Sequence, residues 1–122
     1  MKPAILYVDD DVAMLEMVAL YFRDQGYAVA TAGSGAQAMK AADAERFDLA
    51  LFDINLAGEN GLQLLSYFKT NHPKLPVVMF TGLPEQDELL DEALARGASG
   101  FMCKKDSLKD LCEAVRSYLP AS

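Results

Sequence analysis

The chain has few of the features that mark membrane or secreted proteins. None of its apolar runs approaches the roughly 18 to 20 residues that a membrane-spanning helix needs. The apolar run at the N-terminus, Ala4–Val8, is short and ends in three aspartates, which argues against a secretory signal peptide. We therefore expect a cytoplasmic chain that does not contact membranes.

Basic residues and cysteines are also scarce. The 11 lysines and arginines stand against 18 acidic residues, and the net charge of −7 argues against direct nucleic-acid binding, which favours a basic surface. Cys103 and Cys112 form no CxxC or Cys/His pattern, so we predict reduced core cysteines, with no disulfide or zinc site. The 52% hydrophobic content excludes a disordered chain, and 122 residues suit one compact domain over residues 1–122.

Short apolar runs are what the chain does have, and each of four such runs ends at a polar side chain. An apolar run of about four residues bounded by turn formers is typical of a buried strand. The runs and the residues that follow them are Ile5–Val8 before Asp9 and Asp10, Leu49–Phe52 before Asp53, Val77–Phe80 before Thr81, and Phe101–Cys103 before Lys104.

Helical periodicity alternates with these predicted strands. Leu15, Val18, Ala19 and Phe22 recur at helical spacing before a stop at Gly26. Further helices are predicted around residues 36–44, 62–68, 89–94 and 108–119, and a weaker strand over residues 28–31. Five strands alternating with five helices predict an α/β fold, in which a doubly wound parallel sheet is covered by helices on both faces in three α/β/α layers.

The carboxyl ends of parallel strands share one edge of the sheet, so the polar residues after the strands should converge there. Three carboxylates at one point, Asp9, Asp10 and Asp53, repel one another unless a cation is present. Oxygen ligands of this kind suit Mg²⁺. A carboxylate can then act as a nucleophile towards phosphorus, while the Lys104 ammonium and the Thr81 hydroxyl contact the phosphoryl oxygens.

These residues, in this order and at strand ends, resemble the receiver domain of bacterial two-component response regulators over essentially the whole chain. The resemblance implies a flavodoxin-like, CheY-like fold with strand order 2-1-3-4-5. It implies a phosphorelay function, in which a phosphoacceptor domain is modified and does not act as a turnover enzyme. The implied site comprises the phosphoacceptor Asp53, the Mg²⁺ ligands Asp10, Asp53 and the carbonyl of Asn55, Asp9 acting through water, the phosphate contacts Thr81 and Lys104, and the aromatic switch residue Phe101.

The resemblance also implies partners. A sensor histidine kinase or a phosphotransfer protein would supply the phosphoryl group. A downstream protein or an output domain would read the result on the surface formed by residues 89–94, 101–103 and 108–119. The domain would be a monomer or a phosphorylation-dependent dimer. It would be either a stand-alone receiver or part of a larger regulator or hybrid kinase.

Two positions depart from the family pattern. Ala57 stands where proline is frequent, four residues after Asp53, and Lys105 follows Lys104 where the family usually has a cis proline. Because a cis bond before a non-proline residue costs about 2.5 to 4 kcal/mol, we predict a trans Lys104–Lys105 bond. We also predict that Lys104, favoured over Lys105 by strand alternation, points to Asp53.

Several other interpretations remain open at the level of sequence. Asp11 is predicted to be an N-terminal helix residue that points to solvent, although it could be a third metal ligand. His72 is predicted to be a solvated surface residue, not a phosphohistidine. A degenerate receiver that only binds proteins is an alternative function. A haloacid-dehalogenase-type phosphatase is another, although residues 9–13 fail the last position of its DxDx[TV] motif.

Overall fold

Five parallel strands form one sheet in this computed structural model, which describes residues 2–54, 56, 61–82 and 88–119. The strands are β1 (Ala4–Val8), β2 (Ala28–Ala32), β3 (Leu49–Asp53), β4 (Val77–Thr81) and β5 (Gly100–Cys103). Their spatial order is β2-β1-β3-β4-β5, and every neighbouring pair is parallel. The predicted strand order is confirmed, and all five carboxyl ends lie at the same edge of the sheet.

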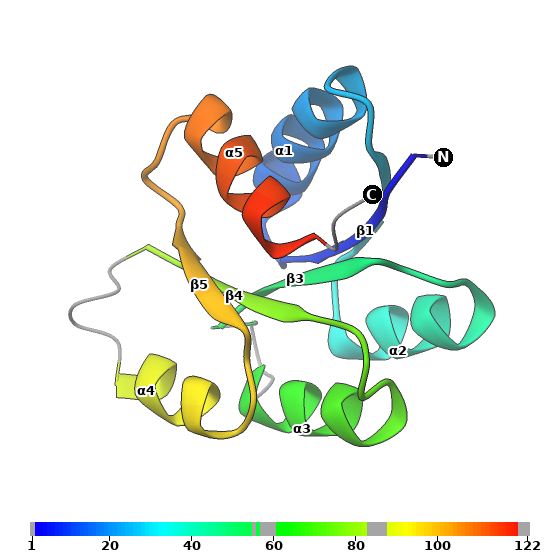
Figure 1. Ribbon diagram of the computed structural model, residues 1–122, viewed down its shortest axis with the longest axis vertical. Coiled ribbons are helices and arrows are strands. Elements are labelled where there is room, and N and C mark those ends of the chain that lie inside the picture. Colours follow the sequence, from blue (N-terminus) through cyan, green and yellow to red (C-terminus); the bar gives the residue numbers. More distant parts are fainter. Residues whose placement is uncertain (1, 55, 57–60, 83–87, 120–122) are drawn as a thin grey trace.

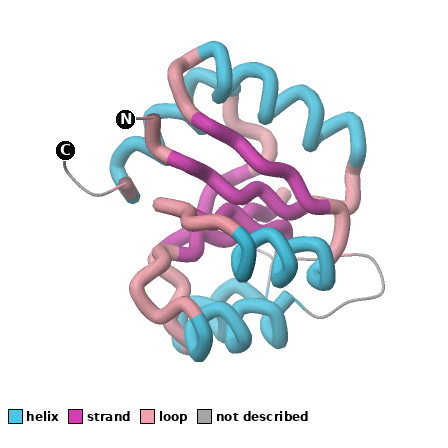
Figure 2. Tube along the Cα trace, turned by 90° about the vertical axis from the view of Figure 1, so that its right-hand side faces the viewer, coloured by secondary structure: helices cyan, strands magenta, loops and turns pink. Residues whose placement is uncertain are grey.

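The helices of the described residues cover both faces of the sheet, as Figures 1 and 2 show. They are α1 (Val12–Asp24), α2 (Gly35–Ala44), α3 (Gly61–Asn71), α4 (Glu88–Ala95) and α5 (Leu108–Tyr118). Helices α1 and α5 lie on one face, and α2, α3 and α4 lie on the other (Figure 1). The predicted three-layer α/β/α architecture is therefore confirmed.

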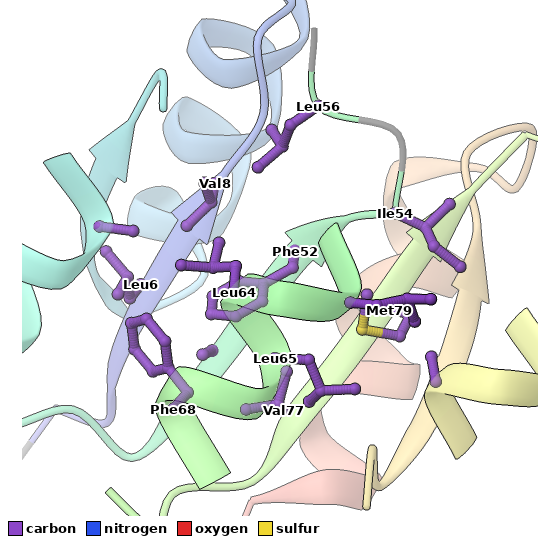
Figure 3. Packing of buried hydrophobic residues seen from close by; sticks show 14 of the residues in the cluster. Leu6, Val8, Phe52, Ile54, Leu56, Leu64, Leu65, Phe68, Val77 and Met79 are labelled. Atoms are coloured by element: carbon purple, nitrogen blue, oxygen red, sulfur yellow. The ribbon is translucent and has the colours of Figure 1, made fainter. Parts of the chain in front are cut away.

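Strand alternation divides the core into two clusters of buried residues. On β3, Ala50 and Phe52 belong to the cluster under α2, α3 and α4, whereas Leu49 and Leu51 belong to the cluster under α1 and α5. In the first cluster, shown in Figure 3, the rings of Phe52 and Phe68 meet edge to face with centroids 4.8 Å apart. Both faces of the central strands β1, β3 and β4 are buried, which explains why their sequences are almost continuously apolar, whereas the edge strands β2 and β5 keep exposed residues.

The predicted helix boundaries have identifiable physical causes. The side chains of Asp11, Ser34 and Ser107 each accept a hydrogen bond from a backbone N–H in the first turn of α1, α2 and α5. Gly26 and Gly97, which follow α1 and α4, have φ angles of 99° and 109°, where other residues are strained. Among the described residues, no helix is long and apolar enough to cross a membrane.

Candidate phosphoryl and metal site

Period-two alternation carries three polar side chains onto one face of the sheet edge. Asp9 follows Tyr7 at a spacing of two residues, Asp53 follows Leu51, and Lys104 follows Met102. Tyr7, Leu51 and Met102 all belong to the core cluster under α1 and α5. The polar residues thus continue the apolar rows of β1, β3 and β5 at the carboxyl ends of these strands, on the side of the sheet that α1 and α5 cover.

Lys104 bridges two carboxylates at this edge. Its Nζ lies 2.9 Å from Asp9 Oδ2 and 3.2 Å from Asp53 Oδ2. Strand β4 separates β5 from β3, and the lysine reaches across it with Nζ 5.6 Å from the centre of the Phe80 ring. The predicted orientation of Lys104 towards Asp53 is confirmed, and the Lys104–Lys105 peptide bond is trans, as predicted.

Asp9 is held by three donors although it is completely buried. Its Oδ1 accepts a hydrogen bond from the Asp11 N–H at 3.0 Å. Its Oδ2 accepts one from the Tyr7 hydroxyl at 2.8 Å and also contacts Lys104. A buried carboxylate needs this kind of compensation, because losing hydration is costly for an ion.

Tyr7 is a site residue that the sequence interpretation missed. It was assigned only to an apolar strand, and its ring is indeed buried against Phe80, with centroids 5.9 Å apart. The signal that could have identified it is the spacing of two residues to Asp9, which places both side chains on one face of an extended chain.

Three carboxylates converge close enough to share a cation. One oxygen each from Asp9, Asp10 and Asp53 lie within 4.8 Å of one another. Asp53 is only 5% exposed, whereas Asp10 is open to solvent. An all-oxygen set with one face open to water is the chemistry that suits Mg²⁺, which keeps several of its waters. Within this group, Asp9 also accepts hydrogen bonds from Tyr7 and Asp11, and both Asp9 and Asp53 contact Lys104.

Burial and the neighbouring carboxylates shift the pKa of two side chains of this site, Lys104 and Tyr7. Burial alone would lower the pKa of Lys104, but its hydrogen bond to Asp9 and the charges of Asp53 and Asp9 raise that pKa above the usual value. Burial, followed by the charge and hydrogen bond of Asp9, raises the pKa of the Tyr7 hydroxyl. Both groups therefore keep their protons as donors at neutral pH.

Of the other predicted site residues, Thr81 lies among the described residues, whereas Asn55 does not. Thr81 is 2% exposed, and its carbonyl oxygen accepts a hydrogen bond from the Lys104 N–H at 2.8 Å, so its backbone adjoins the site. The role of its hydroxyl stays a prediction. Asn55 and Ala57 lie outside the described residues.

Asp11 is the N-cap of α1, where its side chain accepts from Met14 N at 3.2 Å, which agrees with the predicted helical role. His72 is less solvated than predicted. Its side chain is 25% exposed, and Nε2 lies 3.2 Å from Asp43 Oδ1, because the ends of α2 and α3 meet there.

Both the sequence and the fold of this chain are similar to those of known proteins. A family model described as "Response regulator receiver domain" matches residues 5–116. The probable transcriptional regulatory protein TcrX of Mycobacterium tuberculosis is 30% identical over 115 residues, which are 94% of this chain and 49% of TcrX. The alginate biosynthesis transcriptional regulatory protein AlgB of Pseudomonas syringae is 36% identical over 108 residues, with 86% of this chain and 24% of AlgB covered. The chain thus spans at most about half the length of the curated relatives it matches.

Solved structures agree with the family match. Chemotaxis response regulator CheY4 of Vibrio cholerae superposes with a TM-score of 0.88 at 26% identity, covering 98% of this chain and all of CheY4. The receiver domain of NtrX from Brucella abortus superposes with a TM-score of 0.87 at 34% identity, covering 97% of this chain and 99% of that domain.

Proposed function

This chain belongs to the response regulator receiver domain family, and we propose that it takes part in a phosphorelay by accepting a phosphoryl group on Asp53. The observation that carries the proposal is the ion-pair bridge of Lys104 to Asp9 and Asp53, beside the exposed Asp10. A nucleophile, a counter-charge and a candidate cation site lie together at one edge of the sheet. The chain would act as a signalling phosphoacceptor and not as a turnover enzyme.

The transfer step needs little covalent chemistry from the protein. A carboxylate oxygen of Asp53 would form a bond to phosphorus while the bond from phosphorus to the donor breaks. With a phosphohistidine donor, the electron pair of the P–N bond leaves with the imidazole. Positioning and charge neutralisation dominate such reactions, and Lys104 already lies 3.2 Å from the Asp53 carboxylate.

The divalent ion would be held mainly by Asp10 and Asp53, with Asp9 acting through water and the Asn55 carbonyl as a further ligand. When bound, Mg²⁺ supplies positive charge that offsets the phosphoryl oxygens and the neighbouring carboxylates. Among this chain's own groups, Lys104 would share that role, and the Thr81 hydroxyl would donate to a phosphoryl oxygen.

The output surface would be the face formed by α4, β5 and α5. Phe101 on β5 is 44% exposed, and its register partner on β4 is Met79, two residues before Thr81. If Thr81 moves towards the phosphoryl group, Phe101 gains room to turn inward, which makes a two-state element biased by one contact. Identical Phe101 side-chain NMR signals with and without phosphorylation would contradict this coupling.

The partners follow from the same proposal. A sensor histidine kinase or a phosphotransfer protein would donate the phosphoryl group in the cytoplasm. A downstream protein or an attached output domain would bind the α4-β5-α5 face. The receiver domain itself would be a monomer or a phosphorylation-dependent dimer. Direct contacts with nucleic acid or membrane are not part of the proposal, since the chain carries a net charge of −7.

Acetyl phosphate with Mg²⁺ tests the proposal. Wild type should become stably modified and Asp53→Asn should not, although both should have the same circular dichroism spectrum. The matched control is Asp43→Asn, the same change at an exposed aspartate at the end of α2. Equal labelling of Asp53→Asn and wild type would defeat the assignment. Continuous hydrolysis of the donor would indicate a phosphatase, and absence of any modification would indicate a degenerate receiver.

A further inference from the structure

The Tyr7 hydroxyl and the Lys104 ammonium share one oxygen of Asp9. Tyr7 donates to Oδ2 at 2.8 Å, and Lys104 Nζ lies 2.9 Å from the same atom. The other oxygen, Oδ1, is occupied by the Asp11 N–H. Asp9 is fully buried, so its donors are protein groups and not bulk solvent. Any movement of Lys104 therefore changes the number of donors on this oxygen.

The two donors differ in their freedom to move. Tyr7 is completely buried within β1, and its ring meets Phe80 edge to face, so its hydroxyl is held in place. Lys104 follows β5, keeps 23% of its side chain exposed, and already contacts Asp53 with the same Nζ. The ammonium is the partner that can swing towards a group on Asp53, while the hydroxyl stays with Asp9.

We propose that Tyr7 is a positioning residue that keeps Asp9 Oδ2 hydrogen-bonded when Lys104 turns from Asp9 to the phosphoryl group on Asp53. This inference rests on the proposed function. Without the hydroxyl, release of Lys104 would leave a buried, charged oxygen without a donor, which is more costly than losing a solvated contact. Tyr7 thereby favours the phosphorylated state without touching the phosphoryl group.

The test separates anion binding from cation binding, using beryllofluoride as the phosphoryl mimic. In Tyr7→Phe, beryllofluoride affinity at saturating Mg²⁺ should fall by about tenfold or more, the range expected for one hydrogen bond to a charged group. Mg²⁺ affinity measured alone should stay within about twofold of wild type, because Lys104 need not leave Asp9 in that state. Titrations followed by NMR or calorimetry give both constants.

Two comparisons exclude a merely structural effect. Tyr67→Phe removes a hydroxyl that donates to Asp43 at 3.3 Å, at the opposite end of the sheet from Asp9. This variant should change neither the beryllofluoride affinity nor the Mg²⁺ affinity. In a Lys104→Met background there is no ammonium to release, so Tyr7→Phe should cause no further loss of beryllofluoride binding. A loss of the same size in that background would overturn the proposal.

The remaining outcomes are equally decisive. If wild type binds beryllofluoride and Tyr7→Phe binds it equally well, this inference fails while the proposed function stands. If Tyr7→Phe loses Mg²⁺ and beryllofluoride binding together, Tyr7 is a scaffold residue and the inference also fails. If wild type binds none, both proposals fall. If Tyr7→Phe does not fold, the NMR signal of the Tyr7 hydroxyl proton in the wild-type protein tests the inference instead. This signal should stay protected after beryllofluoride is added, and its loss would contradict the role.

Discussion

The molecule contains two clusters with the same chemical parts in different surroundings. At the carboxyl ends of the strands, Tyr7 and Lys104 both contact Asp9, at 2.8 and 2.9 Å. At the other end of the sheet, Tyr67 and His72 both contact Asp43, at 3.3 and 3.2 Å. Each cluster is a tyrosine hydroxyl and a basic side chain on one carboxylate. Asp9 is completely buried, whereas the Asp43 side chain is 59% exposed.

Burial determines what each cluster can do. Water can replace either partner of Asp43, so that cluster contributes little beyond joining the ends of α2 and α3. Asp9 is completely buried, so separating its ion pair with Lys104 costs more than separating an exposed pair, and the charges stay near Asp53. Fixed charges beside a nucleophile are what phosphoryl transfer requires. The comparison predicts that equal changes at the two clusters have unequal effects.

Removing the basic partner from each cluster should give the largest difference. Lys104→Met leaves Asp9 and Asp53 without their common counter-charge, and the free energy of unfolding should fall by about 3 kcal/mol or more. His72→Gln removes the corresponding partner of Asp43 and should lower the free energy of unfolding by less than about 1 kcal/mol. Urea denaturation at pH 7 without Mg²⁺ measures both values. Equal losses would show that burial does not distinguish the clusters.

Alkaline pH should affect the buried cluster of Tyr7, Asp9 and Lys104 through the Tyr7 hydroxyl. The raised pKa of this hydroxyl means that the unfolded chain loses its proton first, so stability is complete below about pH 10 and falls as pH rises further. The Lys104 ammonium, whose pKa is also raised, adds to the fall above its own unfolded value.

Tyr7→Phe should make the decline between about pH 10 and 11 shallower, by up to about 1.4 kcal/mol per pH unit. Tyr67→Phe serves as the control and should change the slope less, because its partner Asp43 is exposed. Denaturation series over this range give the slopes. Identical slopes for Tyr7→Phe and wild type would mean that Tyr7 ionises as it does in water.

Asp10 tests the repulsion among the carboxylates, with a smaller expected effect. Asp10→Asn removes one exposed charge near Asp9 and Asp53 and should raise stability without metal by about 1 kcal/mol. Added Mg²⁺ should stabilise wild type but not this variant. Thermal melts with and without Mg²⁺ check both parts, and an unchanged response to Mg²⁺ would show that the metal binds elsewhere.

The fold could be predicted from the sequence more completely than the side-chain contacts of the site. The alternation of Phe101, Met102 and Cys103 determines which face Lys104 occupies, so its direction followed from local geometry. The Tyr7–Asp9 hydrogen bond has a local signal as well, but buried tyrosines are common in strands, so the spacing alone does not distinguish Tyr7 from a core residue. The His72–Asp43 contact had none, because it joins residues 29 positions apart through the packing of two helix ends.

The central claim is that the buried cluster, and not the exposed one, is the phosphoryl site. The direct measurement is peptide mapping by mass spectrometry after wild-type protein is incubated with acetyl phosphate, with Mg²⁺ or with a chelator. We predict one phosphoryl group, on the peptide that carries Asp53, formed with Mg²⁺ and absent with the chelator. A phosphoryl group on His72 or on another carboxylate, or equal modification without Mg²⁺, would contradict the account.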